Sequence, residues 1–82
     1  MTPTISLVIP VLFDADFASA LLASLPSGCS IEVIVVDGAG DPRLAAIVAA
    51  CPGATLLRAE RGRARQMNAG AAAASGTWLL FL

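Results

Sequence analysis

Three arginines stand at alternate positions, Arg61, Arg63 and Arg65, where the residue pattern predicts the start of a helix running to about Ala74. The N-terminus of a helix carries the positive end of its dipole, so each exposed cation there costs roughly 0.3–1 kcal/mol. An anion such as a diphosphate beside these guanidinium groups would offset that cost. The alternative is a solvated basic loop in which an arginine pairs with Glu60.

Two aspartates follow predicted strands and are candidates for polar contact with a ligand. Asp37 ends a β-rich run and precedes Gly38. Its carboxylate could accept hydrogen bonds from a base N–H or a ribose hydroxyl, or it could serve only the turn. Asp14 follows the first apolar run, where capping the next helix is the simpler role. A cap and a ligand contact can coexist at one helix start.

Composition excludes several function classes. The chain has no histidine, which excludes Ser–His and Cys–His catalysis within it. Cys29 and Cys51, 22 residues apart, do not make a zinc site, and they favour free thiols in a reducing cytoplasm. The net charge of −1 argues against nucleic acid as a partner. A dinucleotide fingerprint after Gly38-Ala39-Gly40 would need glycine at position 43, which is Arg43.

The apolar segments are too short to cross a membrane. Residues 5–13 form an apolar run of nine, and residues 69–82 are interrupted by Ser75-Gly76-Thr77, whereas a spanning helix needs roughly 20 apolar residues. The chain is 57% hydrophobic and only 13% charged, which suits a piece of a larger fold better than a complete small domain.

The pattern of apolar residues predicts strands alternating with helices. Strands are expected at 5–9, where Pro10 ends the run, and at 31–36, 55–58 and 78–82. Helical spacing relates Phe17, Leu21 and Leu25. A second helix should begin at Asp41-Pro42 and bury the apolar positions 44, 47, 48 and 51.

The third helix is expected to end where Ser75-Gly76 caps it. Gly76 is free to adopt a positive φ there, and Met67, Ala71 and Ala74 form a narrow face of small residues along the helix. The order β-α-β-α-β-α-β predicts an α/β fold of three layers with a parallel sheet. Ligands of such sheets bind at the carboxyl ends of the strands, here residues 10–14, 37–41 and 58–62.

Four stretches of the chain resemble family 2 glycosyltransferases. Residues 5–12 resemble the opening of that family, and residues 32–38 resemble its second strand with its aspartate. Residues 62–71, which read GRARQMNAGA, resemble the helix before the family's metal motif, and residues 75–82 resemble the strand leading into it. The sequence of residues 63–71 especially resembles that of the subgroup found beside radical-SAM/selenodomain proteins.

The resemblance implies a GT-A (Rossmann-like) fold, of which residues 1–82 would be the N-terminal nucleotide-sugar-binding part, truncated at the fourth strand. It implies transfer of a sugar from a nucleotide sugar, UDP- or GDP-linked, to an unknown acceptor, with a divalent metal, Mg²⁺ or Mn²⁺. Pro10 and Asp14 would lie at the base and ribose, Asp37 would bind the base, and Arg65 and Asn68 would line the nucleotide pocket.

The family's acidic metal motif should directly follow Leu82, and its catalytic base comes later. The 82-residue chain is therefore expected to lack metal and catalytic residues and to be inactive by itself. The family often has Asn-Glu where this chain has Phe13-Asp14, and a Ser/Thr-containing loop where it has Gly38-Ala39-Gly40. Two other hypotheses stay open: a non-catalytic truncated remnant, and a nucleotide-binding or nucleotidyltransferase-like module.

Overall fold

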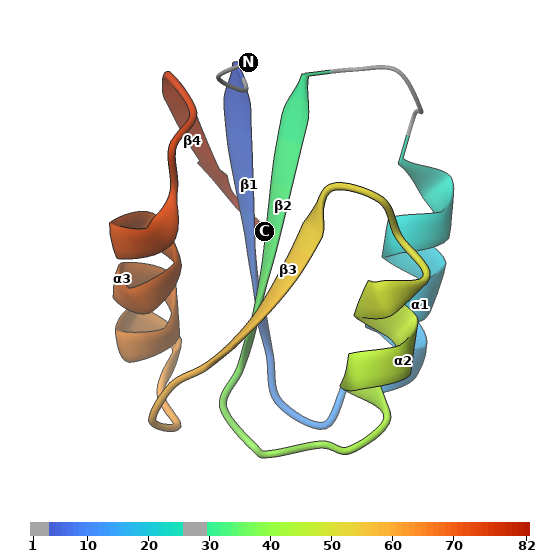
Figure 1. Ribbon diagram of the computed structural model, residues 1–82. Coiled ribbons are helices and arrows are strands. Elements are labelled where there is room, and N and C mark those ends of the chain that lie inside the picture. Colours follow the sequence, from blue (N-terminus) through green and yellow to red (C-terminus); the bar gives the residue numbers. More distant parts are fainter. Residues whose placement is uncertain (1–3, 26–29) are drawn as a thin grey trace.

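The computed structural model describes residues 4–25 and 30–82, and it confirms the predicted order of elements. The elements are β1 (Ile5–Val11), α1 (Ala15–Ser24), β2 (Ile31–Asp37), α2 (Leu44–Ala49), β3 (Ala54–Arg58), α3 (Arg63–Ala73) and β4 (Trp78–Phe81). The four strands form one parallel sheet in the order β3-β2-β1-β4 (Figure 1). Cys29 lies outside the described residues, and Cys51 is a free thiol.

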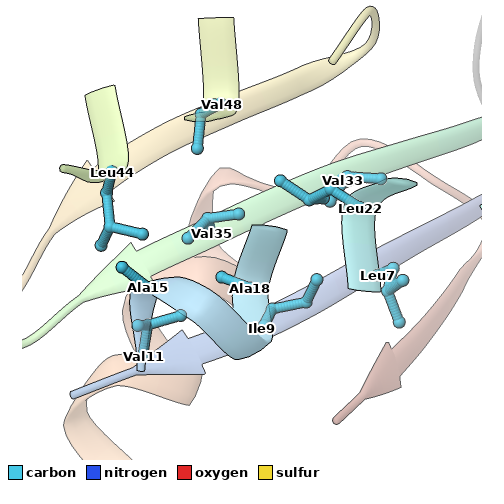
Figure 2. Packing of buried hydrophobic residues seen from close by; sticks show 10 residues of the cluster. All are labelled: Leu7, Ile9, Val11, Ala15, Ala18, Leu22, Val33, Val35, Leu44 and Val48. Carbon is cyan, nitrogen blue, oxygen red and sulfur yellow. The ribbon is translucent and has the colours of Figure 1, made fainter. Parts of the chain in front are cut away.

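The sheet is the middle layer of three, as the sequence predicts. Helices α1 and α2 cover one face and α3 covers the other (Figure 1). Strand residues alternate between the faces, since successive side chains of a strand point in opposite directions. Figure 2 shows the larger cluster, between the sheet and α1 and α2, whose buried members are Leu7, Ile9, Val11, Ala15, Ala18, Leu22, Val33, Val35, Leu44 and Val48. The smaller cluster, under α3, centres on Val8, Ile34 and Val36.

In two helices the most deeply buried residues differ from those that the sequence pattern favours. In α1 the most deeply buried residues are Ala15, Ala18 and Leu22. Of the predicted face, Leu21 and Leu25 are half-buried against the larger cluster, whereas Phe17 is 63% exposed. In α3 they are Gln66 and Gly70. The predicted face of Met67, Ala71 and Ala74 is only half-buried, with Ala74 packed against the smaller cluster. Three of these five buried residues, Ala15, Ala18 and Gly70, are small and let the helix backbone lie close to the sheet. The predicted face of α2 is confirmed, with Leu44 and Val48 buried and residues 47 and 51 packed beside them.

Pro10 lies inside β1 rather than ending it, which corrects the predicted boundary. In the ladder between β1 and β4, Leu82 N–H donates to the Val8 carbonyl at 3.1 Å. The next bond would run from the backbone nitrogen of residue 10 to the Leu82 carbonyl, and proline has no hydrogen to donate. The Arg63 guanidinium donates to that carbonyl instead, at 3.0 Å. A side chain of α3 thus replaces the missing ladder bond.

β4 is an edge strand that pairs with β1 alone. No helix of the described chain covers it, and its apolar side chains remain 39% to 68% exposed. The exposed run comprises Trp78, Leu79, Leu80, Phe81 and Leu82.

The connection between α3 and β4 is tied to the amino ends of β1 and β2 by the Glu32 carboxylate. It accepts hydrogen bonds from the Ser6 hydroxyl at 2.7 Å, the Ser75 N–H at 2.9 Å and the Ser75 hydroxyl at 3.1 Å. The fully buried Ser6 hydroxyl in turn accepts from Gly76 N–H at 2.8 Å. The Ser75 N–H, and then the Ser6 hydroxyl, lower the pKa of Glu32, because both favour the ionised form.

Replacing Glu32 with glutamine is expected to make stability less sensitive to acid. A carboxyl whose pKa is lower in the folded than in the unfolded chain stabilises the fold above the unfolded pKa, about 4.3. That contribution is lost as the pH falls through the folded pKa. Urea unfolding at pH 7, 5, 4 and 3 should show a steeper acid loss for the wild type than for Glu32→Gln. Parallel pH curves for the two proteins would contradict the assignment.

Candidate functional site

A cleft of about 260 Å³ opens at the carboxyl end of the sheet, between the β1–α1 connection and the start of α3. Its lining residues are Pro10, Val11, Leu12, Asp14, Arg61, Gly62, Arg63 and Gln66. This is the edge at which the parallel topology predicts a ligand site. Of the five residues proposed from the resemblance, the structure brings Pro10 and Asp14 into the cleft lining.

Asp14 occupies the N-cap position of α1, but its carboxylate makes no capping hydrogen bond. The helix start is served by the backbone carbonyl of Asp14, which accepts from Ala18 N–H at 2.9 Å. The side chain is exposed and lines the cleft. Within the described residues no hydrogen bond engages its two carboxylate oxygens, which could accept hydrogen bonds from a ligand.

The turn before Asp14 contains a strained residue. Phe13 has φ of 61°, in the left-handed region that costs a residue with a Cβ roughly 1–2 kcal/mol. Its ring is 65% exposed, so packing against the core does not explain the conformation. The strain lies immediately beside the cleft, at the kind of place where strained backbone is found in functional sites.

Asp37 is buried, and its carboxylate organises the loop that follows β2. One oxygen accepts from Ala39 N–H at 2.8 Å and Gly40 N–H at 3.1 Å, and the other accepts from Asp41 N–H at 2.8 Å. The residue is only 2% exposed. A carboxylate offers about four acceptor sites, so roughly one remains for a ligand. The role of Asp37 in binding a base stays a prediction.

The arginines at the start of α3 divide into two groups. Arg61 and Arg63 line the cleft, and Arg63 also bonds the Leu82 carbonyl. Arg65 is exposed and pairs with Glu60 at 2.7 Å, outside the cleft lining, as the solvated-loop alternative has it. Asn68 is exposed and also lies outside that lining. Nucleotide contacts of Arg65 and Asn68 remain predictions.

The N-terminus of α3 faces this cleft without a side-chain cap. Gly62, at the N-cap, has φ of 138°, a conformation that a residue with a side chain rarely adopts. The first N–H groups of a helix lack intrahelical partners and carry the positive end of the dipole. Together with Arg61 and Arg63 they make this side of the cleft suited to an anion.

Gln66 is the residue of the site that the sequence reasoning did not single out. Its side-chain N–H₂ donates to the Val11 and Val36 carbonyls, each at 2.9 Å, and its oxygen lies 3.4 Å from Gly62 N. The side chain is 3% exposed. A glutamine near a helix start usually faces solvent, so nothing in its local sequence signals this burial.

Metal ligands do not cluster in the part of the chain that the structure describes. Within residues 4–25 and 30–82, no three histidine, cysteine, aspartate or glutamate side chains stand together. Asp14 is the one acidic residue of the cleft lining. The described residues therefore do not fit a divalent metal site.

Comparison with known proteins adds one finding. A family model described as Glycosyl transferase family 2 matches residues 6–82. No curated protein matches the chain. Separately, no helix in the described ranges is both long enough and apolar enough to cross a membrane.

Proposed function

Because this chain belongs to glycosyl transferase family 2, we propose that its cleft binds the nucleoside diphosphate part of a nucleotide-sugar donor. The proposed reaction of the protein is transfer of the sugar to an acceptor hydroxyl. The bond between the anomeric carbon and the diphosphate breaks, a bond to the acceptor oxygen forms, and the acceptor proton is released. UDP and GDP are the proposed nucleotides, and the cytoplasm is the proposed location.

The observation that carries the proposal is the opposed chemistry of the two sides of the cleft. On the α3 side, Arg61, Arg63 and the uncapped helix N-terminus offer hydrogen-bond donors and positive charge. On the β1 side, Asp14 offers an uncommitted carboxylate. A nucleoside diphosphate needs both, because its phosphates are anionic while its ribose and base carry donors.

The same cations would assist the reaction as well as binding. Negative charge builds on the diphosphate as it leaves, and fixed donors aimed at that charge stabilise the transition state. Arg65 and Asn68 are proposed as further contacts from the family resemblance. Arg65 would first have to leave Glu60, and an exposed ion pair of this kind is worth only about 0–1 kcal/mol.

Titration calorimetry with UDP, GDP and the matching monophosphates tests this proposal. We expect Arg63→Gln to raise the Kd for the diphosphate about tenfold, the loss of about one charge-assisted hydrogen bond. Arg65→Gln should have a smaller effect, because Arg65 lies outside the cleft lining. Asp14→Asn should weaken the diphosphate and the monophosphate alike.

The monophosphates serve as the control for the diphosphate subsite. Arg63→Gln should weaken them less than it weakens the diphosphates. Absence of binding by either wild-type diphosphate at millimolar concentration would overturn the proposal. If Arg63→Gln and Arg65→Gln raised the Kd equally, the diphosphate would have to bind outside the cleft.

A further inference from the structure

The Gln66 amide joins three segments that are distant in sequence. Its nitrogen donates one hydrogen to the Val11 carbonyl and the other to the Val36 carbonyl, 55 and 30 residues away. Both hydrogens of the amide are therefore used, and this arrangement fixes which end of the amide is nitrogen. The oxygen faces Gly62 N–H, at the N-cap of α3.

Two of these three contacts end at lining residues of the cleft, and the third ends beside the β2–α2 loop. Val11 is the last residue of β1, and the connection to Asp14 follows it. Gly62 is itself a lining residue and precedes Arg63. Val36 is followed by Asp37, whose carboxylate holds the β2–α2 loop. One side chain thus connects both walls of the cleft to the loop beside it.

Gly38 shows how closely the amide is seated. A Cβ built on Gly38 would lie 2.7 Å from Cδ of Gln66 and 2.8 Å from its oxygen. The Gly38 N–H also donates to the Val11 carbonyl at 3.0 Å, so that carbonyl accepts two hydrogen bonds at the point where β1 and β2 end. The fit leaves the glutamine side chain little freedom to adopt another position.

We propose that Gln66 is the positioning residue of the cleft: it sets the distance between the Asp14 wall and the Arg63 wall. The inference rests on the proposed function, since it assigns the geometry of that same nucleotide site. Without the amide bonds, α3 keeps its packing on the sheet, but its first turn is no longer tied to the end of β1. Asp14 and Arg63 then no longer meet one ligand at a fixed spacing, and affinity depends steeply on such spacing.

The test compares Gln66→Met with Val48→Ala in the 82-residue chain. Methionine keeps the length and apolar stem of glutamine but makes none of the three hydrogen bonds. Val48→Ala removes buried packing from the opposite face of the sheet, away from the cleft, and serves as the control for lost stability. For each protein the melting temperature and the Kd for UDP and GDP are measured.

Positioning predicts that Gln66→Met raises the Kd about tenfold or more at a temperature where both variants are folded, while Val48→Ala stays near the wild type. A merely structural role would raise both Kd values in proportion to the loss of melting temperature, and that result would overturn the inference. Ala72→Gln, on the exposed side of α3, should leave both measurements unchanged.

Amide hydrogen exchange tests the role of Gln66 without any ligand. In Gln66→Met, exchange should quicken at Gly62, whose N–H faces the amide oxygen, and at Gly38, whose N–H donates to the Val11 carbonyl that the amide also holds. It should stay slow at Ile34 in the core of β2. Unchanged exchange at Gly38 and Gly62 would overturn the positioning role. If the wild type binds neither nucleotide but this exchange pattern appears, the proposed function fails and the connecting role of Gln66 stands.

Discussion

Replacing Gly76 with alanine is expected to lower the free energy of unfolding by about 3 kcal/mol, because the new methyl group would meet backbone atoms. A Cβ at this position would lie 2.7 Å from Ser6 N, 2.9 Å from the Ile5 carbonyl carbon and 2.6 Å from the Ser6 hydroxyl. A domain of this size has a free energy of unfolding of about 4–12 kcal/mol. The loss would therefore remove a large part of its stability.

The sequence-based reason for Gly76 was wrong in one respect. Among the described glycines, only Gly40, Gly53 and Gly62 have a positive φ, so Gly76 is not required for a left-handed helix cap. It is required because the chain passes directly against β1, where Gly76 N–H bonds the Ser6 hydroxyl. Glycine is needed here because there is no room for a Cβ, and not because of its backbone freedom.

Urea unfolding of Gly76→Ala checks the expectation, with Thr77→Ala as the control at an exposed neighbour. Removing the Ser6 side chain in the double variant Ser6→Gly/Gly76→Ala should not restore stability, because two of the three close contacts are to backbone. A Gly76→Ala protein that unfolds at the wild-type urea concentration would contradict the close approach.

Replacing Gly70 with alanine is expected to cost about 2 kcal/mol, as the net of two opposing effects. A Cβ on Gly70 would clash with Val8 and lie 3.1 Å from a methyl group of Val36. Overpacking of this kind costs about 1–3 kcal/mol, and we take the upper end because Val8 is fully buried. Alanine recovers about 1 kcal/mol through its higher helix propensity.

This clash, unlike the one at Gly76, involves side chains and should be relieved by a second substitution. The double variant Val8→Ala/Gly70→Ala is expected to lose less free energy of unfolding than the two single variants lose together. The difference, which is the coupling energy, should be about 1–2 kcal/mol. Ala72→Gly, exposed on the same helix, measures the helix-propensity term by itself. Strict additivity of Val8→Ala and Gly70→Ala would contradict the packing of α3 against β1.

Local residue patterns were enough to predict the elements of this fold. Apolar runs bounded by turn residues predicted four strands, and the structure has them within a few residues of the expected bounds. The buried face of α2 was also predicted, since its apolar positions follow the helical period without interruption. In α1 and α3 the period was less informative, because alanine and glycine occupy buried positions there as readily as exposed ones.

The lining of the candidate cleft was predictable only in part. Pro10 and Asp14 were proposed and line the cleft, because a residue's place at the end of a strand is a local property that the parallel topology converts into a shared edge. The cluster of arginines was also visible as a local excess of charge at a helix start. The sequence did not show which arginines face the cleft, because that depends on how the turn at Gly62 orients the first residues of α3.

The sequence by itself determined the alternation of strands and helices, the family of the chain and the edge of the sheet at which a ligand is expected. Only the tertiary structure decided the strand order, the replacement of the Pro10 ladder bond by Arg63, and the connection of both cleft walls through Gln66. The physical reason is distance along the chain. Element type follows from residues a few positions apart. The bonds of Gln66 join atoms 30 or more residues apart, and the strand order and the Pro10 replacement depend on which strands pair, which sequence spacing does not identify.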